Sequence, residues 1–132
     1  MKINLGNLKR KWTCCEIDPE DEYFYCGSFS GDIVEINIEN ALHKRMAPCG
    51  KNFSLGVRSL AILPNCDIIV GGGDGTIAKI SIQTMKVKKR SKVWGAVTSL
   101  TFTNDFTHFF AGTADVTIFL NKNNFNSQTY IG

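Results

Sequence analysis

The sequence lacks the features that mark a membrane, a secreted or a nucleic-acid-binding protein. No apolar run approaches the roughly 20 residues that a membrane-spanning helix needs, and Met1-Lys2 is followed by a segment too short and too broken for a signal peptide. The formal net charge is +3, which is too small to indicate nucleic-acid binding by itself. We therefore expect no membrane or nucleic-acid partner, and the cytoplasm as the default location.

The cysteines do not form a metal-binding or disulfide pattern. Their number is odd, their spacing is irregular and no C-x-x-C is present: Cys14, Cys15, Cys26, Cys49 and Cys66. Cys14 and Cys15 are adjacent, so they would point to opposite faces of a strand. Cys15 and Cys26 lie in apolar runs, where a free thiol behaves as a small hydrophobic side chain in a reducing compartment. We expect no zinc site, no disulfide framework and no cofactor.

The residue types that support catalysis are present, but their spacing is wrong for it. The glycine cluster 71–75 lacks the lysine of a phosphate loop and is followed by a strand pattern instead of a helix. His43 and His108 have no partners for a catalytic triad or a metal site. The acidic run 16–22 lacks the spacing of a calcium loop and is interpreted as a solvated turn. The sequence predicts neither an enzyme nor a metal-binding protein.

A glycine-rich hairpin is present, and it recurs. In VGGGDGTIAKI, Val70 to Ile80, an apolar run stops at four glycines and restarts with alternating apolar residues, which is typical of two strands and a turn. Gly27, Gly71 and Gly112 occupy the same place in three such patterns, 44 and 41 residues apart. A period of about 40–45 residues built from short strands indicates propeller blades.

Each repeat is expected to supply a set of antiparallel strands. The predicted strands are WTCCEID, YFYCG, IVEINI and an outer strand around Lys44 to Cys49; then VRSLAIL, IIVG and TIAKISI; then VTSLTFT, HFFAG and TIFLN. Glu35 and Lys79 fall on the same polar side of their strands. The prediction is an all-β fold of about three four-stranded blades, with residues 1–11 as the remnant of a preceding blade, 12–56 as blade 1, 57–96 as blade 2 and 97–132 as blade 3 with an incomplete outer strand.

These segments resemble the WD-repeat family of β-propellers over Trp12 to about Asn121. GVRSLAIL and GAVTSLTF look like the opening strand of a WD repeat, and Asp74-Gly75-Thr76-Ile77 stands where the family often has D-G-T-I. The sequence departs from the family in having no Gly-His dipeptide, and Asn37, Ser81 and Asn121 replace the Trp-Asp pair. The His-centred hydrogen-bond network of such repeats is therefore not expected.

A narrower resemblance involves the order and spacing of four segments. EDEYFYCGSFSGDIVEINI, KNFSLGVRSL, WGAVTSLTF and FFAGT are similar to the cilia- and flagella-associated WD-repeat proteins found inside axonemal doublet microtubules. The resemblance implies a non-enzymatic scaffold of the cytoskeleton, in the cilium or flagellum axoneme, with tubulin and neighbouring luminal proteins as partners. The alternative is a general cytosolic adaptor that binds a peptide or a partner protein.

Three blades are too few to close a ring, because known propellers have about four to eight. The fragment Ile3-Leu5 and the terminal NSQTYIG look like pieces of outer strands that belong to neighbouring blades. We expect the remaining blades of a longer chain, or a second copy, to complete the propeller.

Two surface features are candidate partner-binding sites. The densest basic stretch suits an exposed outer strand, where lysines also discourage edge-to-edge pairing, and it could meet an acidic surface such as tubulin: Lys86, Lys88, Lys89, Arg90 and Lys92. The alternative interpretation of this stretch is a solvated edge. Phe29 stands in the turn SFSGD, where the pattern does not require burial, and would anchor a partner if it is exposed at a blade rim.

Overall fold

Every regular element in the part of the chain that the computed structural model describes is a β-strand, and the strands form three antiparallel sheets of four. The described residues are 11–48, 53–64, 67–93, 95–113, 116–121 and 127–131, with the backbone alone for Pro48 and for the last two ranges. The all-β prediction is confirmed. The predicted fragment at Ile3-Leu5 lies outside the described residues.

The strands of each sheet pair in chain order. The first sheet contains β1 (Trp12–Ile17), β2 (Tyr23–Ser28), β3 (Asp32–Asn37) and β4 (His43–Pro48). The second contains β5 (Val57–Ile62), β6 (Ile68–Gly72), β7 (Thr76–Ser81) and β8 (Lys86–Lys92). The third contains β9 (Ser99–Phe102), β10 (His108–Gly112), β11 (Val116–Asn121) and β12 (Ser127–Ile131).

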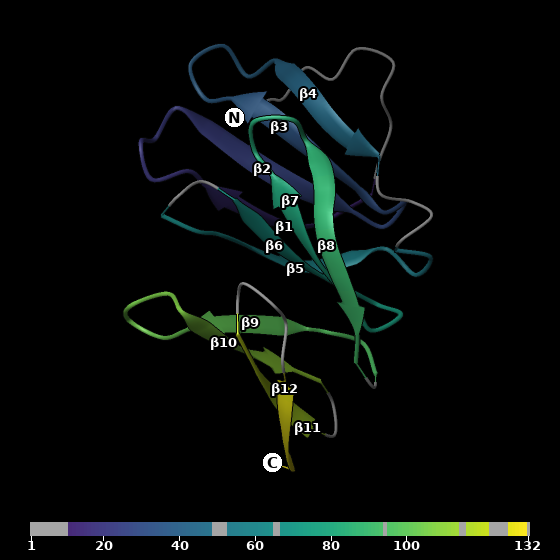
Figure 1. Ribbon diagram of the computed structural model, residues 1–132. Helices are drawn as coiled ribbons and strands as arrows, with labels where there is room; N and C mark the ends of the chain where they lie inside the picture. The colour runs from purple at the N-terminus through teal and green to yellow at the C-terminus, as the bar shows by residue number, and fades with distance from the viewer. Residues whose placement is uncertain are drawn as a thin grey trace.

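The sheets follow one another through the molecule in chain order, from the first at the top of Figure 1 to the third at the bottom. Neighbouring sheets meet through their first strands, because β5 packs against β1 and β2 on one side and against β9 on the other. The Thr13 hydroxyl donates a hydrogen bond across this junction to the carbonyl oxygen of Val57. The last strand of each sheet, β4, β8 or β12, is consequently an outer edge.

Two apolar cores fill the spaces between the three sheets. Ile68, Val70 and Ile80 pack toward the first sheet, in a cluster that includes Tyr25. Ile69 and Ile77 point to the opposite face and pack with other residues toward the third sheet. Because the middle sheet is buried on both faces, its central strands need the continuous apolar runs seen in the sequence instead of a polar-apolar alternation.

The recurring glycine marks the contact between one sheet and the first strand of the next. A Cβ atom on Gly27 would lie 2.5 Å from Cγ1 of Val57, and one on Gly71 would lie 2.4 Å from Cγ1 of Val97. Both distances are far shorter than van der Waals contact allows. The valine that opens each following repeat therefore occupies the space that the missing side chain leaves, which gives the repeat of about 40–45 residues its physical meaning.

Two expectations differ from the structure. Glu35 and Lys79 do share one face of their strands, but that face is turned toward the next sheet, and the side chains are only 2% and 12% exposed. The terminal segment NSQTYIG supplies β12, which pairs with β11 from Val116↔Ile131 to Leu120↔Ser127 and so is the outer strand of the third sheet, not part of a neighbouring blade. Sequence alternation identified β3 and β7, but not what packs on them.

Candidate protein-interaction surfaces

Phe29 lies in the turn between β2 and β3, and 45% of it is exposed to solvent. The turn is fixed by its backbone, since the N–H of Phe29 donates to the carbonyl oxygen of Lys11 (2.8 Å) and the N–H of Gly31 donates to that of Ser28 (3.1 Å). Gly31 has a φ of +94°, which is why the turn requires glycine there. Phe29 thus meets the condition of exposure, on a turn with defined geometry.

Two cations and a second apolar side chain surround Phe29. The guanidinium carbon of Arg58 lies 5.0 Å, and Nζ of Lys11 5.5 Å, from the centroid of the phenyl ring. Leu55, in the loop before β5, is 54% exposed, and its carbonyl oxygen accepts a hydrogen bond from Nε of Arg58 (3.3 Å). We call Lys11, Phe29, Leu55 and Arg58 the rim patch. It spans the junction between the first and second sheets.

The basic stretch forms β8, the outer strand of the second sheet, as predicted. Its side chains alternate between exposed and half-buried: Lys86, Lys88, Arg90 and Lys92 are exposed, and Val87, Lys89 and Ser91 are half-buried. An open hollow of about 420 Å³ lies against the strand and is lined by Val87, Lys88, Lys89 and Arg90. The strand therefore presents positive charge beside a hollow whose lining includes the apolar side chain of Val87.

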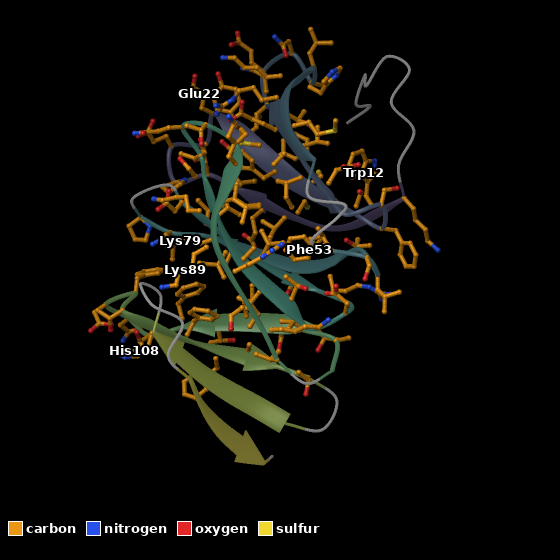
Figure 2. All side chains as sticks on the ribbon, turned by 45° about the vertical axis from the view of Figure 1, so that its right-hand side comes forward. Trp12, Glu22, Phe53, Lys79, Lys89 and His108 are labelled. Carbon is orange, nitrogen blue, oxygen red and sulfur yellow. The ribbon has the colours of Figure 1, made fainter. Side chains whose placement is uncertain are left out.

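Part of this charge is balanced inside the protein. Nζ of Lys88 lies 3.0 Å from Oδ2 of Asp67, and Nζ of Lys79, on the neighbouring strand, lies 3.9 Å from the same oxygen. Lys79 and Lys89 are directly opposite each other in the pairing of β7 with β8, and Figure 2 shows them close together on one side of the molecule. Asp67 thus partly balances Lys88 and Lys79, and Lys86, Arg90 and Lys92 are further exposed cations of β8.

The repeats contain no Gly-His dipeptide, and the turn between β6 and β7 is held by hydrogen bonds to an aspartate. The Asp74 carboxylate accepts hydrogen bonds from the backbone N–H of Thr76 (2.9 Å) and from the Ser54 hydroxyl (3.1 Å). Burial alone would raise the pKa of Asp74, but these hydrogen bonds lower it below its usual value. Phe53, buried in the interior of Figure 2, packs against Gly72, where a Cβ would lie 2.4 Å from its ring. An aspartate and a buried phenylalanine secure this loop.

Sequence reasoning did not identify a polar cluster between the first two sheets. The Tyr25 hydroxyl donates to Oε2 of Glu35 (2.7 Å), and Arg45 donates to both carboxylate oxygens. A further Arg45 nitrogen, Nη1, donates to the carbonyl oxygen of Gln83 (2.9 Å), in the turn between β7 and β8. The signal that could have identified it is the strand register, which places Glu35 directly between Tyr25 and Arg45.

The remaining chemical groups are scattered. Within the described ranges, no three His, Cys, Asp or Glu side chains gather where they could hold a metal ion. His108 begins β10, and its Nδ1 lies 2.9 Å from the Thr107 hydroxyl. Cys49 and Cys66 lie outside the described residues. No helix long and apolar enough to cross a membrane occurs among the residues that the structure covers.

Comparisons with known proteins agree with this geometry. Residues 48–78 match the family model of the WD domain, G-beta repeat. Among solved structures, the WD40 repeats of RRP9 superpose with a TM-score of 0.85 at 16% identity, covering 96% of this chain and 40% of that one. The structure of U3-55K gives a TM-score of 0.83 at 15% identity, covering 96% and 41%. At these identities the likeness shows the fold alone.

Sequence comparison identifies closer relatives. Cilia- and flagella-associated protein 52 of Chlamydomonas reinhardtii is 39% identical over 119 residues, 87% of this chain and 19% of that protein. The proteins of the same name from Bos taurus and Homo sapiens are each 31% identical, over 91% and 86% of this chain. The chain spans about a fifth of the length of these relatives. It is a segment of WD40-repeat propeller, homologous over most of its length to cilia- and flagella-associated protein 52.

Proposed function

We propose that this chain belongs to a non-enzymatic scaffold of the ciliary or flagellar axoneme, which binds neighbouring proteins of the doublet microtubule. The observation that carries the proposal is the identity of 31% to 39% to relatives named cilia- and flagella-associated protein 52 over most of this chain. The segment that they share includes strand β8, whose exposed lysines and arginine suit an acidic protein surface such as tubulin.

Co-sedimentation of the 132-residue chain with microtubules tests this proposal. We expect the bound fraction to fall as salt is raised, because screening weakens contacts between exposed charges. Lys86→Glu and Lys92→Glu, at the two ends of β8, should each reduce binding. Lys44→Glu is the matched control, since it changes the net charge equally on β4, the outer strand of the first sheet. Equal loss in the control would show that net charge, and not β8, determines binding.

A general cytosolic adaptor is the second candidate function. The exposed rim patch favours it, because an exposed phenylalanine and leucine beside two cations suit a short peptide. This candidate expects a soluble complex that forms without microtubules. A chain that enters such complexes in cell extract, and does not sediment with axonemes, would favour the adaptor over the scaffold.

We further propose that other blades, from a longer chain or from a second copy, complete the propeller around these three sheets. The outward faces of the first and third sheets carry exposed apolar side chains, such as Ile17 and Phe110. In the two junctions inside this chain, the corresponding faces are buried. Sedimentation equilibrium tests the proposal, and a monomer that unfolds cooperatively would count against it.

A further inference from the structure

We propose that the rim patch binds an acidic segment of a partner protein, in which carboxylates flank an apolar side chain. The patch is separate from β8, so this proposal adds a second site to the interaction role and names the chemistry of what it binds. It rests on four residues from three parts of the chain: Lys11 before β1, Phe29 in the turn between β2 and β3, and Leu55 and Arg58 around the start of β5.

The apolar part of the patch is held in place before any partner arrives. Gly56 has a φ of +83°, and a Cβ atom there would lie 2.7 Å from the carbonyl oxygen of Phe29, so the two loops touch through their backbones. The N–H of Gly73 donates to the carbonyl oxygen of Gly56 (3.0 Å), and that of Gly56 donates to Phe53 (3.0 Å). Because this backbone is already fixed, binding a partner costs less conformational entropy.

The charges of the patch identify the partner as acidic. Both Lys11 and Arg58 lie within 5.5 Å of the centroid of one phenyl ring, which attracts cations through its negative face. Across the described residues, neither cation forms a salt bridge, whereas Arg45 and Lys88 have Glu35 and Asp67. A carboxylate that approaches both Lys11 and Arg58 is attracted by each cation and offsets the repulsion between them.

A peptide fits the patch better than a nucleic acid does. Arg58 and Lys11 lie over the Phe29 ring, so they compete with a base for stacking on it. Phe29 and Leu55 are 45% and 54% exposed, so both offer apolar surface to an aliphatic or aromatic side chain. The favoured ligand therefore combines carboxylates with an apolar residue.

Fluorescence anisotropy with two labelled peptides tests the proposal directly. The peptide EELEEF should bind the 132-residue chain at least about tenfold more tightly than QQLQQF, because the charge-assisted contacts depend on its carboxylates. Arg58→Gln and Phe29→Ala should each weaken the binding of EELEEF by about fivefold or more. Lys44→Gln on β4, outside both the rim patch and β8, is the matched control and should leave the affinity unchanged.

Three results would contradict the proposal. If EELEEF binds no better than QQLQQF, or if Lys44→Gln weakens it as much as Arg58→Gln does, the patch is not an acidic-peptide site. Tighter binding of a single-stranded oligonucleotide than of EELEEF would also overturn it. Should Phe29→Ala unfold the chain in a circular dichroism melt, Lys11→Gln and Arg58→Gln still decide the matter. Loss of microtubule binding with intact peptide binding would reject the scaffold role alone.

Discussion

Arg45 and Glu35 form a doubly hydrogen-bonded ion pair between neighbouring strands, with Nε 2.8 Å from Oε1 and Nη2 2.7 Å from Oε2. The Glu35 side chain is 2% exposed and that of Arg45 is 37% exposed. Because Arg45 also donates to the carbonyl oxygen of Gln83, in the turn between β7 and β8, one guanidinium neutralises a buried carboxylate and links the first sheet to a turn of the second. The pair is therefore part of the junction, not of the surface.

Replacing Arg45 alone should destabilise the fold strongly. Arg45→Met leaves the Glu35 carboxylate buried without its cation, and breaking a buried pair typically costs 3–5 kcal/mol. We expect a loss of about 3 kcal/mol, at the lower end of that range, because solvent reaches part of Arg45. Urea denaturation followed by tryptophan fluorescence measures the change.

A double variant separates the charge from the packing. In Glu35→Gln/Arg45→Met the buried charge is gone, and the new amide oxygen still accepts the Tyr25 hydroxyl, so the double variant should be more stable than Arg45→Met alone. If the double variant is instead the less stable of the two, the cost of losing Arg45 comes from its packing and its bond to Gln83.

The same carboxylate should make stability depend on pH. Burial alone would raise the pKa of Glu35, but the hydrogen bonds from Arg45 and Tyr25 and the nearby positive charge bring it below the ordinary 4.5. A group whose pKa is lower in the folded state than in the unfolded state stabilises the folded protein at pH values above its unfolded-state pKa. This contribution is lost as the pH falls through the folded-state pKa. Acidification below pH 4.5 should therefore lower the free energy of unfolding.

Urea midpoints measured from pH 6 to pH 3 check this expectation, with Glu35→Gln as the comparison. The variant should show a shallower decline than the wild type over the acidic part of the range, because it lacks the titrating group. Parallel curves for the two proteins would assign the acid sensitivity to other carboxylates. Hydrogen bonds from Thr103 and Thr107 lower the pKa of Asp105 to about 2. The contribution of Asp105 to stability would therefore be lost at a lower pH than that of Glu35.

The recurring glycines predict a graded set of substitutions. In Gly71→Ala the new Cβ would lie 2.4 Å from Cγ1 of Val97, across the junction of the second and third sheets. Overpacking of this kind typically costs about 1–3 kcal/mol. In Gly112→Ala the nearest atom is the Ser99 hydroxyl oxygen, which can rotate away, so this variant is the milder control.

Shortening the side chain of Val97 should restore part of the stability that Gly71→Ala loses. Val97→Ala removes the methyl groups that the new Cβ meets, so Gly71→Ala/Val97→Ala should be less destabilised than the sum of its single changes. Chemical denaturation of the four proteins measures the coupling. Additive losses would show that the cost comes from another neighbour, such as the Ser59 hydroxyl oxygen 2.7 Å from the new Cβ, and not from the methyl groups of Val97.

The strands were predictable because their signals are local. Alternation in IVEINI, the continuous apolar run in IIVG and the glycine at each turn follow from residues that are neighbours along the chain. The position of β8 at an outer edge was also predictable, since five cations in seven residues cannot be buried between sheets.

The contacts between sheets were not predictable, because they join residues far apart in sequence. Alternation places Glu35 on the polar side of its strand, yet a second sheet covers it and Arg45 neutralises it. The exposure of Phe29 followed from its turn, but the approach of Arg58 depends on how the second sheet packs against the first. Alternating residues show which side chains share one face of a strand, but tertiary packing determines which face is exposed to solvent.

The thiols of β1 and β2 should react at very different rates. Cys15 and Cys26 are directly opposite each other in the pairing of these strands, but Cys15 is exposed and Cys26 is buried. Burial, together with the nearby Cys15 and Cys14, raises the pKa of Cys26 to about 12. Since the thiolate is the reactive form, iodoacetamide at pH 8 should modify Cys26 more slowly than Cys15 by a factor on the order of a hundred or more.

Peptide mass spectrometry at successive times measures the rates of modification of Cys15 and Cys26. The same reaction in guanidinium, where the two rates should be alike, is the control. Equal rates in the native protein would mean that β1 opens readily from β2, and that the face carrying Cys26 is not closed in solution.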